Sequence, residues 1–196
     1  MNSFIFIGRS GCGKGTQADL LQKHLESQGE SILYIETGEK FRKFFTEDGY
    51  TNTISRRLYE SGERQPDFLA CDMWTHILMD SFGGEQSVIF DGTSRSLSEA
   101  KVLDTALEFF GFKNKIVVYI NVSREWSKKH LMARKRFDDV DAAEIEKRLD
   151  WFEKDAIPAI KSYQDDPSYS FFEIQGEAPI DAVSLNLIAA IKPIVG

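Results

Sequence analysis

The feature that most limits how this chain can fold is a glycine-rich segment at residues 8–17, Gly-Arg-Ser-Gly-Cys-Gly-Lys-Gly-Thr-Gln. A short apolar run at 3–7 comes before it, and residues 15–27 carry apolar side chains at helical spacing. Glycines allow a tight turn between a buried strand and a helix, with backbone N–H groups pointing inward at the helix N-terminus. The sequence therefore predicts a strand–loop–helix unit within a parallel α/β sheet.

The same segment has the spacing of a phosphate-binding loop (P-loop), Gly-x-x-x-x-Gly-Lys, with the threonine one place later than in the commonest form. The side chain of Lys14 can reach the β- and γ-phosphates, and the hydroxyl of Thr16 can face Mg²⁺. The alternative is a glycine-rich turn that binds nothing, but the position between a strand and a helix favours nucleotide binding. We expect the loop to hold the phosphates of ATP through Gly11, Cys12, Gly13 and Gly15.

Strand-like and helix-like segments alternate along the chain. Short apolar runs predict strands at 3–7, 31–35, 87–90, 116–122 and 169–174. Helical patterns lie at 15–27, 39–62, 67–82, 96–110, 123–136, 142–164 and 180–191. This alternation predicts a five-stranded parallel sheet with helices on both faces, an α/β/α arrangement of three layers. The length of 196 residues suits a single domain.

Composition limits the classes of partner. The net charge of −7 argues against a general affinity for nucleic acid or for anionic membranes. The two cysteines, Cys12 and Cys71, are too few for a disulfide framework. The chain starts without a basic segment or a cleavage site, and the apolar run at 116–122 is too short to cross a bilayer. We therefore expect a cytoplasmic protein with no nucleic-acid or membrane partner.

Several motifs in order give the chain a resemblance to the adenylate kinase family of nucleoside monophosphate kinases. Beside Gly-Lys-Gly-Thr-Gln at 13–17, the segment Thr37-Gly38-Glu39 with Phe41-Arg42 is similar to the family's acceptor-site element. Residues 62–67 resemble the segment beside the acceptor base, and 91–96 follow the family's Asp-Gly-Phe-Pro-Arg-Thr. The remaining matches are the lid and the helix after it, at Arg134, Arg136, Asp138, Asp139 and Arg148, and the turn near the ATP base, at 174–176.

This resemblance implies the P-loop NTPase fold in one nucleoside monophosphate kinase domain, 1–196. The core would comprise 1–36, 67–129 and 141–196, with a monophosphate-binding insertion at 37–66 and a very short lid at 130–140. The implied activity is transfer of the γ-phosphate of ATP, with Mg²⁺, to a nucleoside monophosphate, with AMP as the expected acceptor and ADP as the product. The resemblance also favours a monomer, and the absence of a four-cysteine cluster implies no structural zinc.

The resemblance also implies roles for single residues. The monophosphate would be bound by Thr37, Gly38, Arg42, Gln65, Gly92, Arg95, Glu99, Arg136 and Arg148. The catalytic residues would be Lys14, Arg95, Arg134, Arg136 and Arg148. ATP would further be contacted by His130, Arg134 and Gly176, and Mg²⁺ would be held, largely through water, by Thr16 and Asp91. These cations suit the chemistry, because phosphoryl transfer needs positive charge around the migrating group.

Plainer interpretations exist for several of these residues. An arginine on an exposed helix, such as Arg136, is often a solvated surface residue. The alternative role for Asp91 is to cap the turn before the next helix without binding a metal ion. Asp138 and Asp139 are expected to orient arginines. The three tryptophans lie on predicted helices and are expected to pack in the core or at an interface; they are Trp74, Trp126 and Trp151.

Four departures from the family pattern bear on function. Thr93 and Ser94 replace a phenylalanine and a proline, which we expect to loosen their loop. Glu99 replaces a glutamine that reads adenine; a carboxylate suits guanine better, unless Glu99 only completes a capping box with Ser96. The lid is nearly absent, which predicts some ATP hydrolysis without an acceptor. His130 replaces an arginine over the ATP base and either stacks there or stays on the helix surface.

The sequence leaves other functions open. The same chemistry could act on GMP, on CMP or UMP, or on a deoxynucleotide. A P-loop kinase for a small molecule would phosphorylate a hydroxyl group, but a neutral acceptor would leave Arg42 and Arg95 without an anion. A nucleotide-binding regulator without turnover would lack matched cations, whereas only the residue at His130 has changed.

Overall fold

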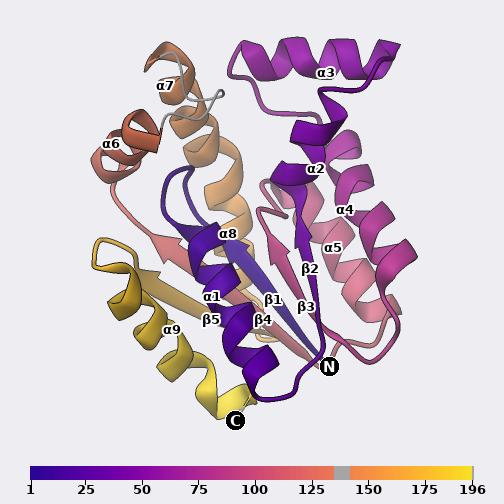
Figure 1. The fold of residues 1–196 in the computed structure, drawn as a ribbon, viewed down its shortest axis with the longest axis vertical. Coiled ribbons are helices and arrows are strands. Elements are labelled where there is room, and N and C mark those ends of the chain that lie inside the picture. Colours follow the sequence, from indigo (N-terminus) through magenta and orange to yellow (C-terminus); the bar gives the residue numbers. More distant parts are fainter. Residues whose placement is uncertain (135–141, 196) are drawn as a thin grey trace.

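The computed structural model describes residues 1–134, the last by its backbone alone, and residues 142–195. Their strands are all parallel and form one sheet in the order β2-β3-β1-β4-β5. They are β1 (Asn2–Ile7), β2 (Ile32–Glu36), β3 (Ser87–Asp91), β4 (Asn114–Asn121) and β5 (Tyr169–Gln175). The prediction of a five-stranded parallel sheet is confirmed, with β1 at its centre (Figure 1).

Helices connect these strands. In chain order they are α1 (Lys14–Ser27), α2 (Thr37–Phe44), α3 (Tyr50–Glu60), α4 (Asp67–Ser81), α5 (Leu97–Phe109), α6 (Arg124–Arg134), α7 (Ala142–Trp151), the π-helical turn η1 (Phe152–Ala156), α8 (Ile157–Asp165) and α9 (Ile180–Val195). No helix in the described part of the chain has the length and apolar character needed to cross a membrane.

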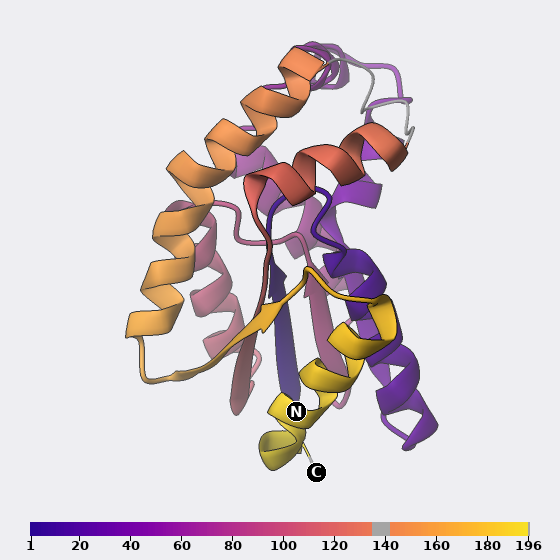
Figure 2. The ribbon, with the colours of Figure 1, turned by 90° about the vertical axis from the view of Figure 1, so that its left-hand side faces the viewer.

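Side chains that alternate along the strands build one core on each face of the sheet. On β1, Phe4 and Phe6 pack with residues of α1 and α9. Ile5 and Ile7 belong to the opposite core, which includes residues of α4, α5 and α8. Figure 2 shows the sheet between α5 and α8 on one side and α1 and α9 on the other. Both faces are covered, which explains the unbroken apolar run of β1 and confirms the three-layer α/β/α prediction.

The charged helical segments predicted within 39–62 are two helices, α2 and α3. One predicted helix differs from its expected form. The predicted helix at 142–164 is interrupted by the wide turn η1 at 152–156. Pro158, in the first turn of α8, has no N–H to donate to the preceding turn, and its ring would clash with a carbonyl of a regular α-helix. The wider turn before it accommodates this proline.

The carboxyl ends of β1, β2 and β3 lead into segments that share one edge of the sheet. β1 continues into the glycine-rich loop, β2 into α2, and β3 into the turn before α5. The α2–α3 segment lies beyond this edge, with α3 across the top of the view in Figure 1. In open α/β sheets this edge is where ligands bind, so the three connections border the candidate site.

The packing of α9 supplies a direct test of the two-core arrangement. Leu187 is 0 % exposed, whereas Leu185, two residues earlier on the same helix, is 68 % exposed. We expect Leu187→Ala to lower the free energy of unfolding by about 2–5 kcal/mol, because it leaves a cavity in the core. The matched variant Leu185→Ala should change it by less than about 0.5 kcal/mol. Urea unfolding of both variants checks this, and equal losses would contradict the assigned face of α9.

Candidate functional site

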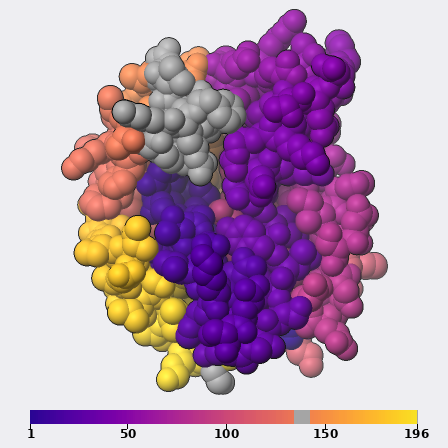
Figure 3. Space-filling view, viewed as in Figure 1, coloured from indigo at the N-terminus to yellow at the C-terminus, as the bar shows by residue number. Residues whose placement is uncertain are grey.

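A cavity of about 490 Å³ lies at the carboxyl edge of the sheet. It is bordered by the phosphate loop, the ends of β2 and β3, and residues of α2, α4, α5 and α7. In the space-filling view, the purple α2–α3 segment and the orange-red α6 lie on either side of the indigo surface around the loop (Figure 3). The predicted site residues that line it are Gly11, Lys14, Gly15, Thr16, Thr37, Gly38, Arg42, Gln65, Asp91, Gly92, Arg95, Glu99 and Arg148.

The phosphate loop packs tightly against β4 and α6. A Cβ atom at Gly8 would lie 2.6 Å from Cys12 Sγ and 2.8 Å from the carbonyl oxygen of Ile120. A Cβ atom at Gly11, whose φ is +83°, would lie 2.9 Å from the carbonyl oxygen of Ser127. Gly13 caps α1 in the left-handed conformation. Glycine is therefore required along this loop, which fixes the start of α1 at the cavity.

Cys12 is a buried packing residue of the loop rather than an exposed thiol. Its side chain is 4 % exposed and belongs to the core under α1 and α9. Burial raises the pKa of the Cys12 thiol, although the charge of Lys14 opposes this. The thiol is thus held in its neutral form, and any contact of Cys12 with ATP would come from its backbone.

Asp91, the last residue of β3, faces the phosphate loop. Its Oδ2 atom accepts a hydrogen bond of 3.2 Å from the hydroxyl of Tyr34 and would lie 3.0 Å from a Cβ atom at Gly15. Its Oδ1 atom is buried and has no hydrogen-bond partner among the described residues. Burial, and next the charge of Asp91, raise the pKa of Tyr34. A buried carboxylate oxygen without a partner, beside Thr16 in the same cavity, fits the oxygen ligands of hydrated Mg²⁺.

Two arginines meet at the other end of the cavity, around Gly38. A Cβ atom at Gly38 would lie 3.3 Å from Arg42 Nη1 and 3.8 Å from Arg95 Nη2. Arg42 is oriented by an ion pair of 2.7 Å with Glu36, and Arg95 donates from Nε to the carbonyl oxygen of Gly92 at 2.7 Å. This turn requires glycine at position 92, because its φ is +73° and a Cβ atom there would lie 2.7 Å from Arg95 Nη2. The guanidinium groups thus converge on one point, as a bound anion requires.

Thr93 and Ser94 do not loosen their loop, so that expectation is wrong. The hydroxyl of Thr93 lies 2.9 Å from that of Thr37, and the hydroxyl of Ser94 lies 2.8 Å from that of Tyr163. Thr93 and Ser94 are 1 % and 0 % exposed. Ser94 has φ +61°, a value that proline cannot adopt. The residues here therefore build a different, buried and hydrogen-bonded turn.

Glu99 and Arg64 form a partly buried charge cluster in the cavity wall. Glu99 is 1 % exposed, and its Oε1 atom lies 3.2 Å from Arg64 Nη1. Arg64 also pairs with Asp67 at 2.6 Å and with Asp155 at 3.2 Å. The hydroxyl of Ser96 accepts a hydrogen bond from the backbone N–H of Glu99, which is one half of the proposed capping box. The carboxylate of Glu99 pairs with Arg64 instead of completing the other half. The Oε2 atom of Glu99 is buried and has no partner among the described residues.

Arg64 is a residue of the cavity wall that the sequence analysis did not single out. It lies in the segment 62–67, where the sequence does not distinguish its charge from an ordinary surface charge. The only sequence signal was indirect: a carboxylate at a core position such as Glu99 requires a cation nearby. Gln65, in contrast, was predicted to bind the monophosphate. Its side-chain amide is hydrogen-bonded to Ser55: it accepts from the hydroxyl of Ser55 and donates to the carbonyl oxygen of Ser55.

The remaining predicted site residues have different surroundings. Arg148 is 8 % exposed and lies over the ring of Tyr59, 5.2 Å from its centroid. His130 stacks on Trp126 with ring centroids 4.4 Å apart and does not line the cavity. Gly176 is needed for packing, because a Cβ atom there would lie 2.7 Å from Ile120 Cγ2 and Val122 Cγ1. The residues that fall outside the described part are Arg136, Asp138 and Asp139, with the side chain of Arg134.

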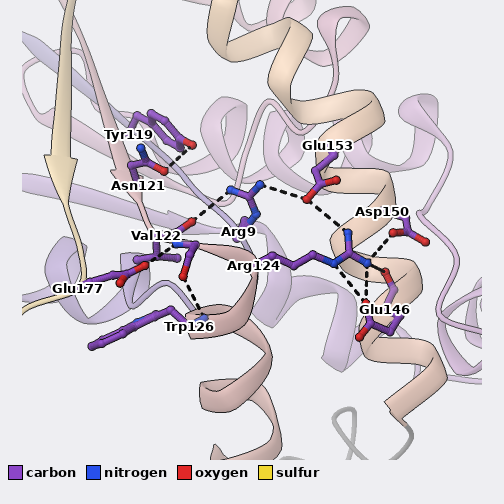
Figure 4. Close-up of polar contacts among 11 residues, drawn as sticks. Arg9, Tyr119, Asn121, Val122, Arg124, Trp126, Glu146, Asp150, Glu153 and Glu177 are labelled. Carbon is purple, nitrogen blue, oxygen red and sulfur yellow. Dashed lines mark hydrogen bonds and ion pairs between the residues drawn. The ribbon is translucent and has the colours of Figure 1, made fainter.

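A second cluster, also missed by the sequence analysis, ties the phosphate loop to α7 and η1. Arg9 donates to the carbonyl oxygen of Val122 at 3.2 Å and pairs with Glu153 at 3.1 Å (Figure 4). Its guanidinium also lies over the ring of Phe152, 4.9 Å from the centroid. Arg124, at the start of α6, pairs with Glu153 at 3.3 Å and with two carboxylates of α7. These contacts join residues that are far apart in the sequence.

Comparison with known proteins assigns the family. The family model described as "Adenylate kinase" matches residues 6–167. The chain belongs to the adenylate kinase family. It is 29 % identical to "Adenylate kinase 1" of Nostoc sp. over 97 % of this chain and 99 % of the relative. It is 31 % identical to "Adenylate kinase" of Prochlorococcus marinus (strain MIT 9301) over 82 % of this chain and 84 % of the relative. As a member of the adenylate kinase family, it is a phosphotransferase that uses a phosphate group as acceptor.

A further relative covers nearly the whole length as well. The chain is 28 % identical to "Adenylate kinase" of Phocaeicola vulgatus over 98 % of this chain and 99 % of the relative. The family resemblance inferred from motifs is thereby confirmed. No group of three or more His, Cys, Asp and Glu side chains that could hold a metal ion occurs in 1–133 and 142–195.

The burial of Glu99 predicts a dependence of stability on pH. Burial raises the pKa of Glu99 above its ordinary 4.5, although the charges of Arg95 and Arg64 oppose this shift. The folded state therefore binds this proton more tightly than the unfolded state. The resulting stability is present below the ordinary pKa and is lost as the pH rises through the folded pKa.

We expect Glu99→Gln, which carries no titrating proton, to gain stability relative to the native protein as the pH rises above 4.5. Urea unfolding between about pH 4 and pH 8 measures this difference. Glu108→Gln, at an exposed position of the same helix, is the matched control. A difference between native protein and Glu99→Gln that stays constant with pH would contradict the expected titration.

Proposed function

We propose that this member of the adenylate kinase family transfers the γ-phosphoryl group of ATP to AMP, giving two molecules of ADP. The observation that carries the proposal is one cavity that is lined by cationic side chains from two parts of the chain. One end has Lys14 on the phosphate loop, and the other has Arg42 and Arg95 around Gly38. Such a cavity suits two polyanionic substrates. A neutral hydroxyl acceptor would leave the guanidinium group of Arg95 without an anion.

The proposed work of the protein is to position two phosphates and to supply positive charge. Lys14 and the N-terminus of α1 hold the ATP phosphates, while Arg42 and Arg95 hold the phosphate of AMP. Arg148, and in this proposal also Arg134 and Arg136, surround the migrating phosphoryl group. Asp91 and Thr16 would hold Mg²⁺, which would supply positive charge to offset the negative charge of the phosphates. Bringing the two phosphates into line removes much of the entropic barrier to transfer.

Several further features belong to the proposal. The monophosphate-binding insertion spans 37–66, the lid spans 130–140, and the rest of the chain forms the core. The predicted contacts of His130 and Gly176 with the adenine of ATP stay predictions. The protein acts as a monomer on small-molecule nucleotides and binds no nucleic acid.

A coupled assay with ATP, Mg²⁺ and each nucleoside monophosphate in turn tests this function. We expect turnover with AMP, and some ATP hydrolysis in the acceptor-free control because the predicted lid is short. Nucleotide binding without acceptor-dependent turnover would contradict the proposal and favour a regulator. Turnover with a hydroxyl compound alone would favour the small-molecule kinase.

Arg95 gives a sharper test of the acceptor end. We expect Arg95→Met to lower kcat/KM for AMP by about 100-fold or more, because a donor aimed at developing charge is lost. Arg57→Met, at an exposed position of α3, is the matched control and should leave kcat/KM near the native value. Kinetics at varied AMP concentration measure both variants. Equal activity of the two would show that Arg95 is only a surface cation.

Glu99 is the proposed determinant of base preference. A carboxylate only accepts hydrogen bonds, whereas adenine presents an acceptor at N1 beside its N6 amino group, and a glutamine can satisfy both. We expect Glu99→Gln to raise the ratio of kcat/KM for AMP to that for GMP by about tenfold, because an unpaired buried polar group costs about 1–3 kcal/mol. An unchanged ratio would mean that Glu99 serves only the ion pair with Arg64.

A further inference from the structure

Glu36, the last residue of β2, is a carboxylate of the cavity wall that the sequence analysis did not single out. It occupies the N-cap position of α2, but its side chain makes no capping hydrogen bond to that helix. Shorter polar side chains are favoured at this position because they reach the first N–H groups of a helix. The side chain of Glu36 instead extends to Arg42, whose Nη2 atom donates to Glu36 Oε1 at 2.7 Å. Glu36 therefore acts in the cavity rather than as a helix cap.

The carboxylate of Glu36 lies at the place where the two arginines of the acceptor end converge. A Cβ atom at Gly38 would lie 3.8 Å from Glu36 Oε1. The same atom would lie 3.3 Å from Arg42 Nη1 and 3.8 Å from Arg95 Nη2. Carboxylate and phosphate oxygens accept hydrogen bonds from guanidinium groups in the same way. Glu36 thus uses part of the donor capacity of Arg42 that a bound phosphate group would need.

The ion pair of Glu36 and Arg42 is open to a ligand. The side chain of Glu36 is 29 % exposed and that of Arg42 is 27 % exposed, and both line the large cavity. Ion pairs that remain in contact with water contribute little to the free energy of unfolding. A ligand can therefore separate this pair without disturbing the fold.

The charge of Glu36 opposes the binding of an anion in its present position. Glu36 and Asp91 are neighbours in the register of β2 and β3, so two carboxylates end adjacent strands at the cavity. Like charges at short distance weaken binding, and they do so more strongly where water is partly excluded. A phosphate group beside Gly38 would bind between Arg42 and Arg95 more favourably once the carboxylate of Glu36 has turned away.

We propose that Glu36 sets the affinity of the acceptor end: its carboxylate holds Arg42 in the nucleotide-free protein and is displaced by the phosphate group of the incoming monophosphate. This inference rests on the proposed function, because it assumes that a monophosphate binds between Arg42 and Arg95. The displacement weakens the binding of every anion at this place. Inorganic phosphate, which has no nucleoside to make further contacts, is thereby kept off the arginines at concentrations at which a nucleotide still binds.

Glu36→Gln tests the proposal, because it removes the charge and keeps the size of the side chain. We expect calorimetry without ATP to show about tenfold tighter binding of AMP, because no carboxylate competes with the phosphate group. The KM for AMP should fall in parallel, whereas the KM for ATP should stay within about twofold of the native value. Glu60→Gln, at an exposed position of α3, makes the same change in net charge and should leave the affinity for AMP unchanged.

Glu36→Ala separates displacement from orientation of Arg42. It removes the hydrogen bond to Arg42 together with the charge, and we expect it also to bind AMP more tightly than the native protein. Weaker binding in Glu36→Ala would overturn the proposal, because the ion pair would then serve to orient Arg42 for the phosphate. A gain in Glu36→Gln that is matched by Glu60→Gln would overturn it as well, because it would reflect net charge alone.

The two hypotheses fail in different ways. Absence of AMP-dependent turnover in the native protein would overturn the proposed function, and the binding of AMP measured without ATP would still test Glu36. Unchanged or weaker binding of AMP in Glu36→Gln would overturn the role of Glu36, and turnover with AMP in the native protein would still support the proposed function.

Discussion

The close approach of the phosphate loop to β4 and α6 is the contact on which the site depends. Side chains at Gly8 and Gly11 would collide with Cys12 Sγ and with backbone carbonyl groups, so the loop can occupy this position only with glycine there. The position of the loop sets the start of α1, and with it Lys14 and Thr16. It also brings Gly15 next to Asp91 at the end of β3. One packing constraint thus places Lys14, Thr16 and Asp91 together at one edge of the sheet.

Five cations around the cavity fall into two groups. Arg9, Arg64 and Arg124 are joined to carboxylates and hold the phosphate loop, the segment that contains Arg64 and α6 against α7 and η1. Lys14 and Arg95 line the cavity, and neither forms an ion pair with another residue in the part of the chain that the structure describes. The first group builds the site, and the second is available to substrate phosphates. Glu153 and Asp155 connect the first group through η1, the turn that also follows Trp151.

Local patterns in the sequence predicted most of the fold and much of the cavity wall. The apolar runs predicted the five strands, and the spacing at 8–17 predicted the loop and the place of Lys14. Contacts between distant residues were not predictable, because the pairing of Arg64 with Glu99 or of Arg9 with Glu153 leaves no local signal. The left-handed turn at Ser94 was also missed, because its hydroxyl bonds with the distant Tyr163. The wide turn η1 was missed although Pro158 is a local signal of an interrupted helix.

The central claim is that one cavity brings the γ-phosphate of ATP to the phosphate of AMP. Following the label from [γ-³²P]ATP in the presence of AMP and Mg²⁺ tests it most directly. Our account predicts that the label moves into ADP, faster than it appears as inorganic phosphate. Label that appears only as inorganic phosphate, at the same rate with and without AMP, would contradict the account, because the arginine end of the cavity would then not present an acceptor.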